Sequence, residues 1–354
     1  MNKFILNIPS LLYNIASIKK CLKADTLFCA MVKANAYGHG LKAVCQNIQH
    51  AVDYFGVACV TEGLKLRQFN IGKPILVVGA YDKNSANKAV INQLTLTVFS
   101  CAQIEHLTKT CKKLNMCAYV HIKINTGMNR LGVNKKAEFV HMLKLLINNR
   151  FIKLAGVFSH LAREDKLSIK KQNREFLKYK KLCKGFKGII FHLSSSFAAV
   201  NYSEFNYDMV RIGLAMYGYC HGNIKLKPAI SVISNVCSVI DVKKGEFIGY
   251  GDACRCPKNM TVATVPLGYA DGINLKLSNQ AIVHVVGKPA QVVGRICMDM
   301  LMIDTTNLGV KIGDEVIIFD NLNNASVWSA LCGNHEYEIL TSFKTNRMRA
   351  IVKK

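Results

Sequence analysis

The chain has 354 residues, half of them hydrophobic, so it can bury a large core and fold as two domains; a fibrous or disordered protein is excluded. Its formal net charge of +25 suggests nucleic acid or an acidic membrane as partner, but the lysines are spread along the chain without interleaved aromatic residues, so we expect neither. Its fourteen cysteines include no C-x-x-C pair and no histidine at zinc-like spacing, so we expect reduced thiols, no disulfide framework and no metal site.

The first 25 residues begin with a lysine and several apolar side chains, as a secretory signal does. Asn7, Pro9, Ser10 and Asn14 interrupt the apolar core that such a signal needs. No run of 18 or more apolar residues follows elsewhere, so the sequence contains no candidate transmembrane helix. We therefore expect a cytoplasmic protein.

Short apolar runs rich in β-branched residues alternate with amphipathic segments through the first two thirds of the chain. In the amphipathic segment 135–149, Phe139, Leu143 and Leu146 share one helical face. The apolar runs are LFCAMVK (27–33), YFGVACV (54–60), ILVVG (75–79), LTLTVF (94–99), AYVHIKIN (118–125), LAGVFSH (154–160), IIFHLSS (189–195) and DMVRIGLAMYG (208–218). Eight such units predict a parallel sheet closed into a (β/α)₈ barrel over residues 1–228, and an open doubly wound sheet is the alternative.

The sequence pattern changes at about residue 229, where strand-like runs follow one another without helical segments between them. The runs are SVISNVCSVIDV, MTVATVPL, AIVHVV, AQVVGRICM, LMIDTT and EVIIF, separated by Gly, Asn and Asp turns. This pattern predicts a second, all-β domain over residues 229–354. No long linker or low-complexity segment separates the two domains.

Several polar side chains fall where the predicted barrel strands end. These are Lys33, Lys123, His160, Ser195 and Ser196, and Arg211 lies within the last strand. Because reactive groups of such barrels lie at the carboxyl ends of the strands, we expect these side chains to converge on one mouth.

Lys33 carries the most specific chemistry of this set. An ammonium group at the inner end of a buried strand is costly to desolvate, so its pKa falls and part of it is a neutral amine that can attack a carbonyl carbon. The alternative is a lysine whose charged end simply reaches solvent.

The stretch VKANAYGHG (32–40) resembles the pyridoxal-phosphate attachment signature of the alanine racemases, and the resemblance extends along nearly the whole chain. Further matching stretches occur in the order and spacing of that family, namely HIKINTGMNRLG (121–132), GVFSHLA (156–162), MVRIGLAMYG (209–218), PLGYADG (266–272), GRICMDM (294–300) and YEILT (337–341). Each short stretch alone is weak evidence for the family, but the stretches together are specific for it.

The resemblance implies a role for individual residues. Lys33 would bind pyridoxal 5'-phosphate covalently, and Tyr250 would be the opposing acid and base. His160 and Arg211 would support Tyr250, with Arg211 also facing the pyridine nitrogen. Arg130 would contact the phenolic oxygen of the cofactor and the substrate carboxylate, which the backbone of Met298 would also hold. The residues implied to surround the phosphate are Tyr37, Ser196, Gly213, Leu214 and Tyr337. The matching lysine is carbamylated in many members of the family, so Lys123 is a candidate for that modification.

These residue types suit racemisation, which removes a proton from one face of Cα and returns one to the other. The cofactor is an electron sink for this step, and two bases on opposite faces perform it more simply than one. A free tyrosine titrates near pH 10, so Tyr250 needs nearby positive charge, which Arg211 could provide through His160. Taken alone, Tyr250 is more simply a turn tyrosine, His160 a core histidine and Arg211 an ion-pair partner.

The sequence also departs from the family pattern at several positions. Asn125 replaces an aspartate, Ser195 stands where asparagine is common, and Leu275 with Lys276 occupies an expected arginine position. The stretch before Tyr337 reads GNHE, and Ile351 replaces a final tyrosine. Both proposed bases remain matched, so these changes affect substrate range and rate more than the type of reaction.

The resemblance further implies a homodimer in which Lys33 of one subunit meets Tyr250 of the other, and a supply of D-alanine for peptidoglycan. The substrate that the resemblance implies is a small amino acid. The alternatives are a serine or broad-range racemase, a barrel-type amino-acid decarboxylase, and a non-enzymatic pyridoxal-phosphate carrier. Carriers lack a β domain with an opposing tyrosine, so residues 229–354 favour an enzyme.

Overall fold

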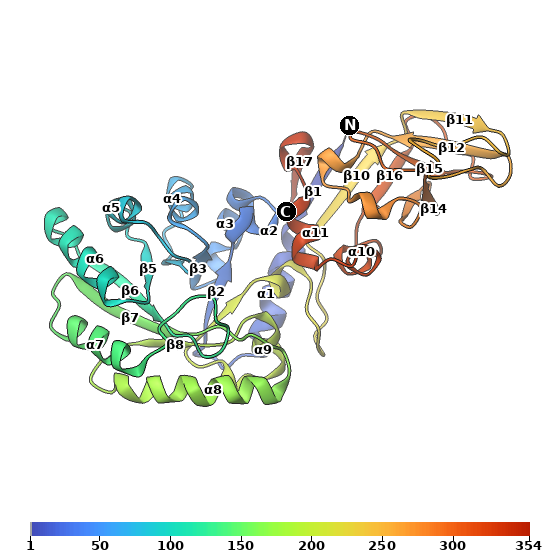
Figure 1. Ribbon diagram of the computed structural model, residues 1–354. Helices are drawn as coiled ribbons and strands as arrows, with labels where there is room; N and C mark the ends of the chain where they lie inside the picture. The colour runs from blue at the N-terminus through green and yellow to red at the C-terminus, as the bar shows by residue number, and fades with distance from the viewer. Residues whose placement is uncertain (1) are drawn as a thin grey trace.

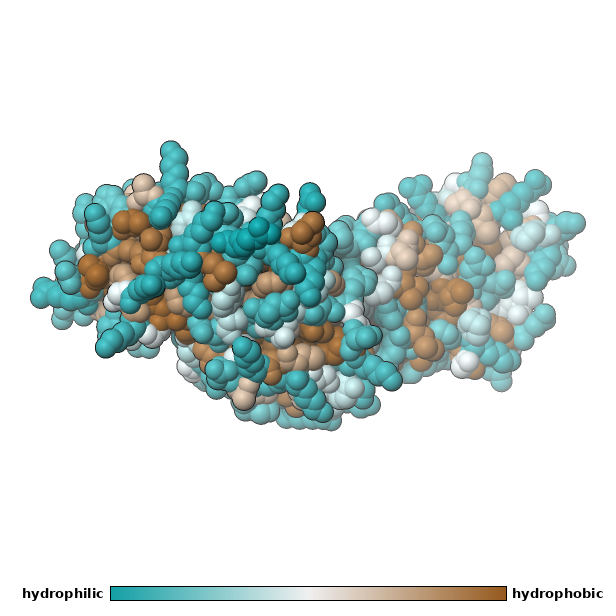
Figure 2. Space-filling view, turned by 90° about the horizontal axis from the view of Figure 1, so that it is seen from below, coloured by the Kyte–Doolittle hydropathy of each residue, from teal (hydrophilic) through white to brown (hydrophobic). Residues whose placement is uncertain are grey.

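The computed structural model describes residues 2–354, which form two lobes joined side by side (Figure 1). Figure 2 shows hydrophilic side chains over most of the barrel lobe, with apolar side chains in separate patches. Among the helices of residues 2–354, none combines the length and the apolar character that crossing a membrane requires.

The first lobe is an eight-stranded parallel sheet that curves into a nearly closed barrel, in the order β8-β7-β6-β5-β4-β3-β2-β9. Its strands are β2 (Leu27–Met31), β3 (Tyr54–Val57), β4 (Ile75–Val77), β5 (Thr95–Val98), β6 (Ala118–Lys123), β7 (Ile152–Phe158), β8 (Ile190–His192) and β9 (Met209–Ile212). A parallel bridge between Ser195 and Arg211 closes the seam between β8 and β9. The predicted (β/α)₈ barrel is therefore confirmed, and the open sheet is not the fold.

Amphipathic helices cover the barrel because each has an apolar stripe that must leave water. In α7, Phe139, Leu143 and Leu146 are buried, as their spacing predicts. Side chains of Asp82, Ser100 and Asp165 cap the first turns of α5, α6 and α8. The barrel helices are α1 (Ile8–Lys19), α3 (Leu41–Ile48), α4 (Val60–Gln68), α5 (Lys83–Ile91), α6 (Cys101–Leu114), α7 (Lys136–Ile147), α8 (Lys166–Lys180) and α9 (Ser196–Asn201).

The predicted strand 208–218 is too long by several residues. Strand β9 ends at Ile212, and Leu214–Tyr217 forms a 3₁₀ turn instead. The stretch is mostly apolar because both elements are buried, and burial alone does not distinguish a strand from a short helical turn.

The second lobe is a nine-stranded sheet in the order β11-β12-β15-β14-β13-β16-β10-β1-β17. Its strands are β1 (Lys3–Asn7), β10 (Ile230–Asn235), β11 (Ser238–Val242), β12 (Met260–Val265), β13 (Ile282–Val285), β14 (Lys288–Val293), β15 (Leu301–Asp304), β16 (Glu315–Phe319) and β17 (Arg349–Lys353). Strand β1 pairs antiparallel with β10 and parallel with β17, so this strand lies in the second lobe, before α1 enters the barrel.

Two short helices, α10 (Ala325–Cys332) and α11 (Glu336–Ser342), accompany this sheet. Helix α11 packs against the segment that follows β2, where a Cβ atom on Gly38 would overlap the backbone oxygen of Leu340. Gly38 also has a φ of 81°, so a glycine suits both the contact and the backbone. This close approach brings the start of α11, with Tyr337, to the barrel mouth.

Candidate active site

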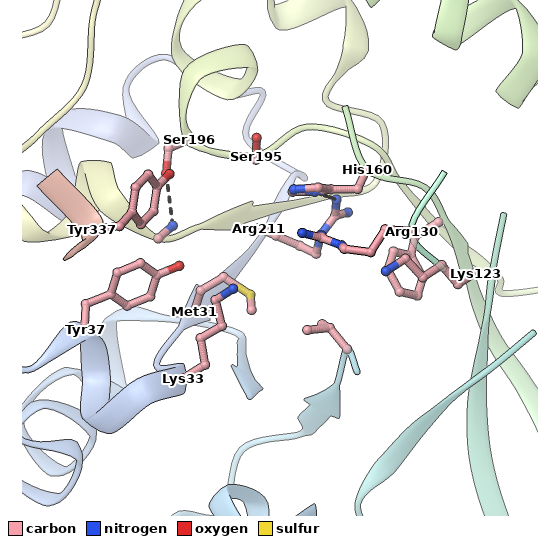
Figure 3. A pocket seen from close by; sticks show the side chains of 13 residues that line it. Met31, Lys33, Tyr37, Lys123, Arg130, His160, Ser195, Ser196, Arg211 and Tyr337 are labelled. Carbon is pink, nitrogen blue, oxygen red and sulfur yellow. Dashed lines mark hydrogen bonds between the residues drawn. The ribbon is translucent and has the colours of Figure 1, made fainter. Parts of the chain in front are cut away.

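The carboxyl ends of the barrel strands surround a cavity of about 300 Å³ (Figure 3). It is lined by the predicted site residues Lys33, Tyr37, Lys123, Arg130, His160, Ser196, Arg211, Gly213 and Tyr337, together with Met31, Val78, Phe158 and Ser195. Hydroxyl groups gather at one end, cationic and imidazole groups gather at the other, and the Lys33 amine lies between them. No carboxylate is among these lining residues.

Lys33 begins a short turn, α2 (Lys33–Tyr37), directly after β2. Four successive non-glycine residues of this turn have φ between 51° and 54°, namely Ala34, Asn35, Ala36 and Tyr37. The left-handed helical conformation costs roughly 1–2 kcal/mol per residue, so the surroundings must enforce it. The turn directs both Lys33 and Tyr37 into the cavity.

Arg211 is buried and holds the cationic end of the cavity together. Its Nη2 donates to the backbone oxygens of Ser159 and Leu193, at 2.7 and 3.1 Å, and lies 3.4 Å from Nδ1 of His160. Its Nη1 lies 2.8 Å from Nδ1 of His192. The guanidinium also lies 5.2 Å above the ring of Phe158, which stacks on His192.

Two buried histidines extend this network away from the cavity. Since a guanidinium only donates, Nδ1 of His192 accepts from Arg211, and its Nε2–H is left to donate to Nδ1 of His121, 2.8 Å away. Burial, followed by the charge of Arg211, lowers the pKa of His192 well below its usual value and that of His121 to about 3. Neither histidine is among the site residues predicted from the sequence. Their positions were the only indication in the sequence. His121 stands on β6, two residues before Lys123, and His192 is the last residue of β8.

Burial and mutual repulsion weaken the basicity of several groups in the cavity. Burial and then Arg130 lower the pKa of the Lys33 amine. Burial, then Arg130, Arg211 and Lys33, lower the pKa of Lys123 to about 8. Burial and then Arg211 lower the pKa of His160 to about 3, so its imidazole is neutral at physiological pH. Arg211 itself stays charged, although burial lowers its pKa to about 10.

The hydroxyl end of the cavity is built around Ser196. Its Oγ accepts hydrogen bonds from the backbone N–H groups of Gly213 and Ala215, at 3.0 and 3.3 Å. Because both bonds use its oxygen as acceptor, the hydroxyl hydrogen is left to donate. A Cβ atom on Gly213 would overlap the hydroxyl of Tyr37, so a glycine is required there. Leu214 does not line the cavity but an adjoining hollow that shares Ser196 and Tyr337 with it.

Tyr250 and Met298 do not reach this cavity. They lie together in a surface hollow of the second lobe, where Tyr250 is 70% exposed and Met298 is 54% exposed. The structure of one chain therefore brings the predicted groups together around Lys33 except for these two and for Leu214, which lies in the adjoining hollow.

Of the positions that depart from the family pattern, one lines the cavity and others lie away from it. The Asn125 amide donates to the side-chain oxygens of Asn129 and Asn134, at 2.8 and 2.6 Å, so the amide donates where a carboxylate could not. Ser195 lines the cavity, whereas Leu275 is 40% exposed and Ile351 lies in β17.

The fold and the cavity are typical of barrel enzymes, whose reactive groups lie at the barrel mouth, here with an amine of lowered pKa among them. Residues 6–221 match the family model "Alanine racemase, N-terminal domain", and residues 229–351 match "Alanine racemase, C-terminal domain". The chain belongs to the alanine racemase family, and its activity is the racemisation of alanine.

Individual relatives match over nearly their whole length. Alanine racemase 2 of Caldanaerobacter subterraneus subsp. tengcongensis is 34% identical over 329 residues, which cover 88% of this chain and 84% of that protein. The structure of the alanine racemase of Clostridium difficile 630 has a TM-score of 0.93 at 32% identity and covers 99% of this chain and 95% of that one. The alanine racemase of Bacillus anthracis with bound L-Ala-P has a TM-score of 0.91 at 30% identity, covering 100% of this chain and 95% of that one.

Proposed function

We propose that this alanine racemase uses pyridoxal 5'-phosphate bound at Lys33 and works by a two-base mechanism. The observation that carries this proposal is the placement of the Lys33 amine between a hydroxyl-lined end and a cationic end of one cavity. Its lowered pKa favours the neutral amine, which is the form that attacks a carbonyl carbon.

The residues of the cavity fit this cofactor. The phosphate would lie at the hydroxyl end, against Tyr37, Ser196, Tyr337 and the backbone at Gly213 and Leu214. The Tyr37 hydroxyl, which lies close against Gly213, and the free hydroxyl hydrogen of Ser196 suit a phosphate oxygen. Arg211 would face the pyridine nitrogen. A guanidinium donates a hydrogen bond but holds its proton tightly, so it would leave that nitrogen unprotonated. When bound, the cofactor would withdraw electrons from the substrate and acidify its Cα–H bond.

Two side chains would then move the proton. The Lys33 amine would take it from one face of Cα or return it there, and the Tyr250 hydroxyl of a second subunit would do the same at the other face. The neutral His160, bonded to Arg211, would support the Tyr250 phenolate with a hydrogen bond and with the positive charge behind it. Arg130 and the backbone at Met298 would hold the substrate carboxylate.

We propose residues 1–228 as the cofactor-binding domain and residues 229–354 as the domain that contributes the second base, although β1 pairs within the second sheet. The exposure of Tyr250 and its distance from the cavity of its own chain support a homodimer whose sites combine both subunits. The free cysteines of residues 2–354 support a reducing, cytoplasmic location, where the D-alanine would supply peptidoglycan synthesis.

Lys123 is our candidate for a carbamylated lysine. Its pKa of about 8 leaves much of the amine neutral at pH 8, and a neutral amine adds to carbon dioxide with loss of one proton. The carbamate would place a negative charge beside Arg130 and so orient it. We expect a carbamate carbon signal in NMR spectra of protein kept in ¹³C-labelled bicarbonate, retained in Lys33→Ala and absent from Lys123→Ala. A signal that survives in Lys123→Ala would contradict the assignment.

Alanine is expected to be the preferred substrate, because the cavity of about 300 Å³ must hold both cofactor and amino acid. The test is to incubate purified protein and added cofactor with L-alanine or L-serine, and to measure the D-enantiomers and released carbon dioxide. We expect the highest kcat/KM with alanine and no carbon dioxide. Faster turnover of serine, release of carbon dioxide, or cofactor binding without turnover would favour the broad-range racemase, decarboxylase or carrier instead.

A further inference from the structure

Glu62 does not line the cavity, yet its carboxylate joins the loops that follow two neighbouring barrel strands. It lies in the first turn of α4, and its Oε1 accepts a hydrogen bond from the backbone N–H of Ala34 at 2.7 Å. Its Oε2 accepts one from the backbone N–H of Ala58, also at 2.7 Å. Ala34 follows β2 and Ala58 follows β3. Bonds from N–H groups to an ionised carboxylate are short and strong, so this one side chain fixes the two loops to each other.

The segment that Glu62 contacts is the left-handed turn after β2, which non-glycine residues adopt only when held. Two bonds hold its far end: the Asn35 side chain accepts from the N–H of Leu41 at 2.8 Å, and Nδ1 of His39 donates to the oxygen of Tyr37 at 2.8 Å. At its start, the Glu62 carboxylate receives the N–H of Ala34.

The charge of Glu62 also opposes that of the cavity. The titratable groups that line the cavity with Lys33 are Tyr37, Lys123, Arg130, His160, Arg211 and Tyr337, and none of them is a carboxylate. Burial and Arg130 lower the pKa of the Lys33 amine, whereas the Glu62 carboxylate raises it.

We propose that Glu62 is a positioning residue for racemisation, which holds the turn that directs Lys33 and Tyr37 into the cavity and whose negative charge acts on the Lys33 amine. This inference rests on the proposed function, because it takes Lys33 as the residue that binds the cofactor. Glu62 itself need not touch cofactor or substrate.

The first test is Glu62→Gln, which keeps the size of the side chain but removes its charge. In cofactor-free protein, the rate of pyridoxal-phosphate uptake is measured against pH from the absorbance of the bound cofactor. Without the carboxylate the Lys33 ammonium loses its proton more easily, so the midpoint of this profile is expected to move to lower pH. Because the turn is also less well held, kcat is expected to fall about 10- to 100-fold.

Asp53→Asn is the matched control. The Asp53 carboxylate accepts a hydrogen bond from the backbone N–H of Phe28 at 2.8 Å, at the opposite end of β2. The substitution therefore weakens a bond of the same kind at a place away from Lys33. We expect a similar loss of stability in urea unfolding, with an unchanged midpoint. A Glu62→Gln midpoint equal to that of the wild type, or an equal shift in Asp53→Asn, would overturn the inference. If the wild type takes up no cofactor at Lys33, the proposed function fails instead.

The substitution Ala34→Gly separates the two roles of Glu62, which are to hold the turn and to act by its charge on Lys33. Ala34 is exposed, and glycine adopts the left-handed conformation at no steric cost, so Ala34→Gly should replace the lost support. In the double variant with Glu62→Gln, we expect kcat to recover while the uptake midpoint stays shifted. If Glu62→Gln alone does not fold, the double variant is expected to fold. Failure of glycine to restore either folding or kcat would overturn the positioning role.

Discussion

The Lys33→Ala variant is expected to lose racemase activity by about 10³- to 10⁴-fold in kcat/KM, because it removes both the attachment point of the cofactor and one proposed base. Cofactor added to this variant should wash out on gel filtration. Borohydride reduction of the wild type should fix the cofactor on the peptide that contains Lys33, which mass spectrometry identifies.

A second lysine makes this experiment discriminating. Lys123 lines the same cavity, and its pKa of about 8 also makes it reactive. If Lys33→Ala still carried reducible cofactor, on Lys123, the assignment of Lys33 would be wrong. Lys42→Ala is the control, since Lys42 is an exposed lysine of α3 and its loss should leave both cofactor content and turnover unchanged.

Mixing two inactive variants is expected to restore activity if each site combines two subunits. Tyr250→Phe keeps Lys33 but lacks the proposed second base, so it should lose about 10²- to 10⁴-fold in activity on its own. After unfolding and refolding together, Lys33→Ala and Tyr250→Phe form mixed dimers in which one site of two is intact. Random pairing then restores about one quarter of the wild-type activity per subunit.

The result of this mixing depends on the position of Tyr250, which is exposed on the second lobe and absent from the cavity of its own chain. If both bases came from one chain, no mixed dimer would contain an active site, and the mixture would stay inactive. Tyr119→Phe is the control for loss of an exposed tyrosine hydroxyl, because Tyr119 lies near the amino end of β6, away from the cavity. It should retain full activity.

The sequence alone determined the barrel, because the evidence for it is local. Most residues of the eight apolar runs are buried, and segments with an apolar stripe alternate with the runs, so composition and period identified them one at a time. The position of Lys33 directly after the first of these runs followed in the same way. The matching stretches from VKANAYGHG to YEILT identified the family.

Other features depended on which distant segments meet, and local patterns do not encode this. Strand β1 reads as the start of the barrel domain but pairs with β10 and β17, more than 220 residues later in the chain. The Arg211–His192–His121 chain joins three strands through side-chain geometry, and each histidine alone reads as a core residue.

The site divides along the same line. Sequence spacing placed Lys33, Lys123 and His160 at strand ends, where the carboxyl ends of parallel strands meet by construction. It could not place Tyr337, which reaches the cavity only because α11 packs against Gly38. Nor could it show Glu62 at the turn after Lys33, because the bond from Ala34 to Glu62 forms only when β2 and β3 lie side by side. The pattern of apolar residues within one segment shows how that segment is buried, whereas contacts between distant segments form only when the whole chain folds.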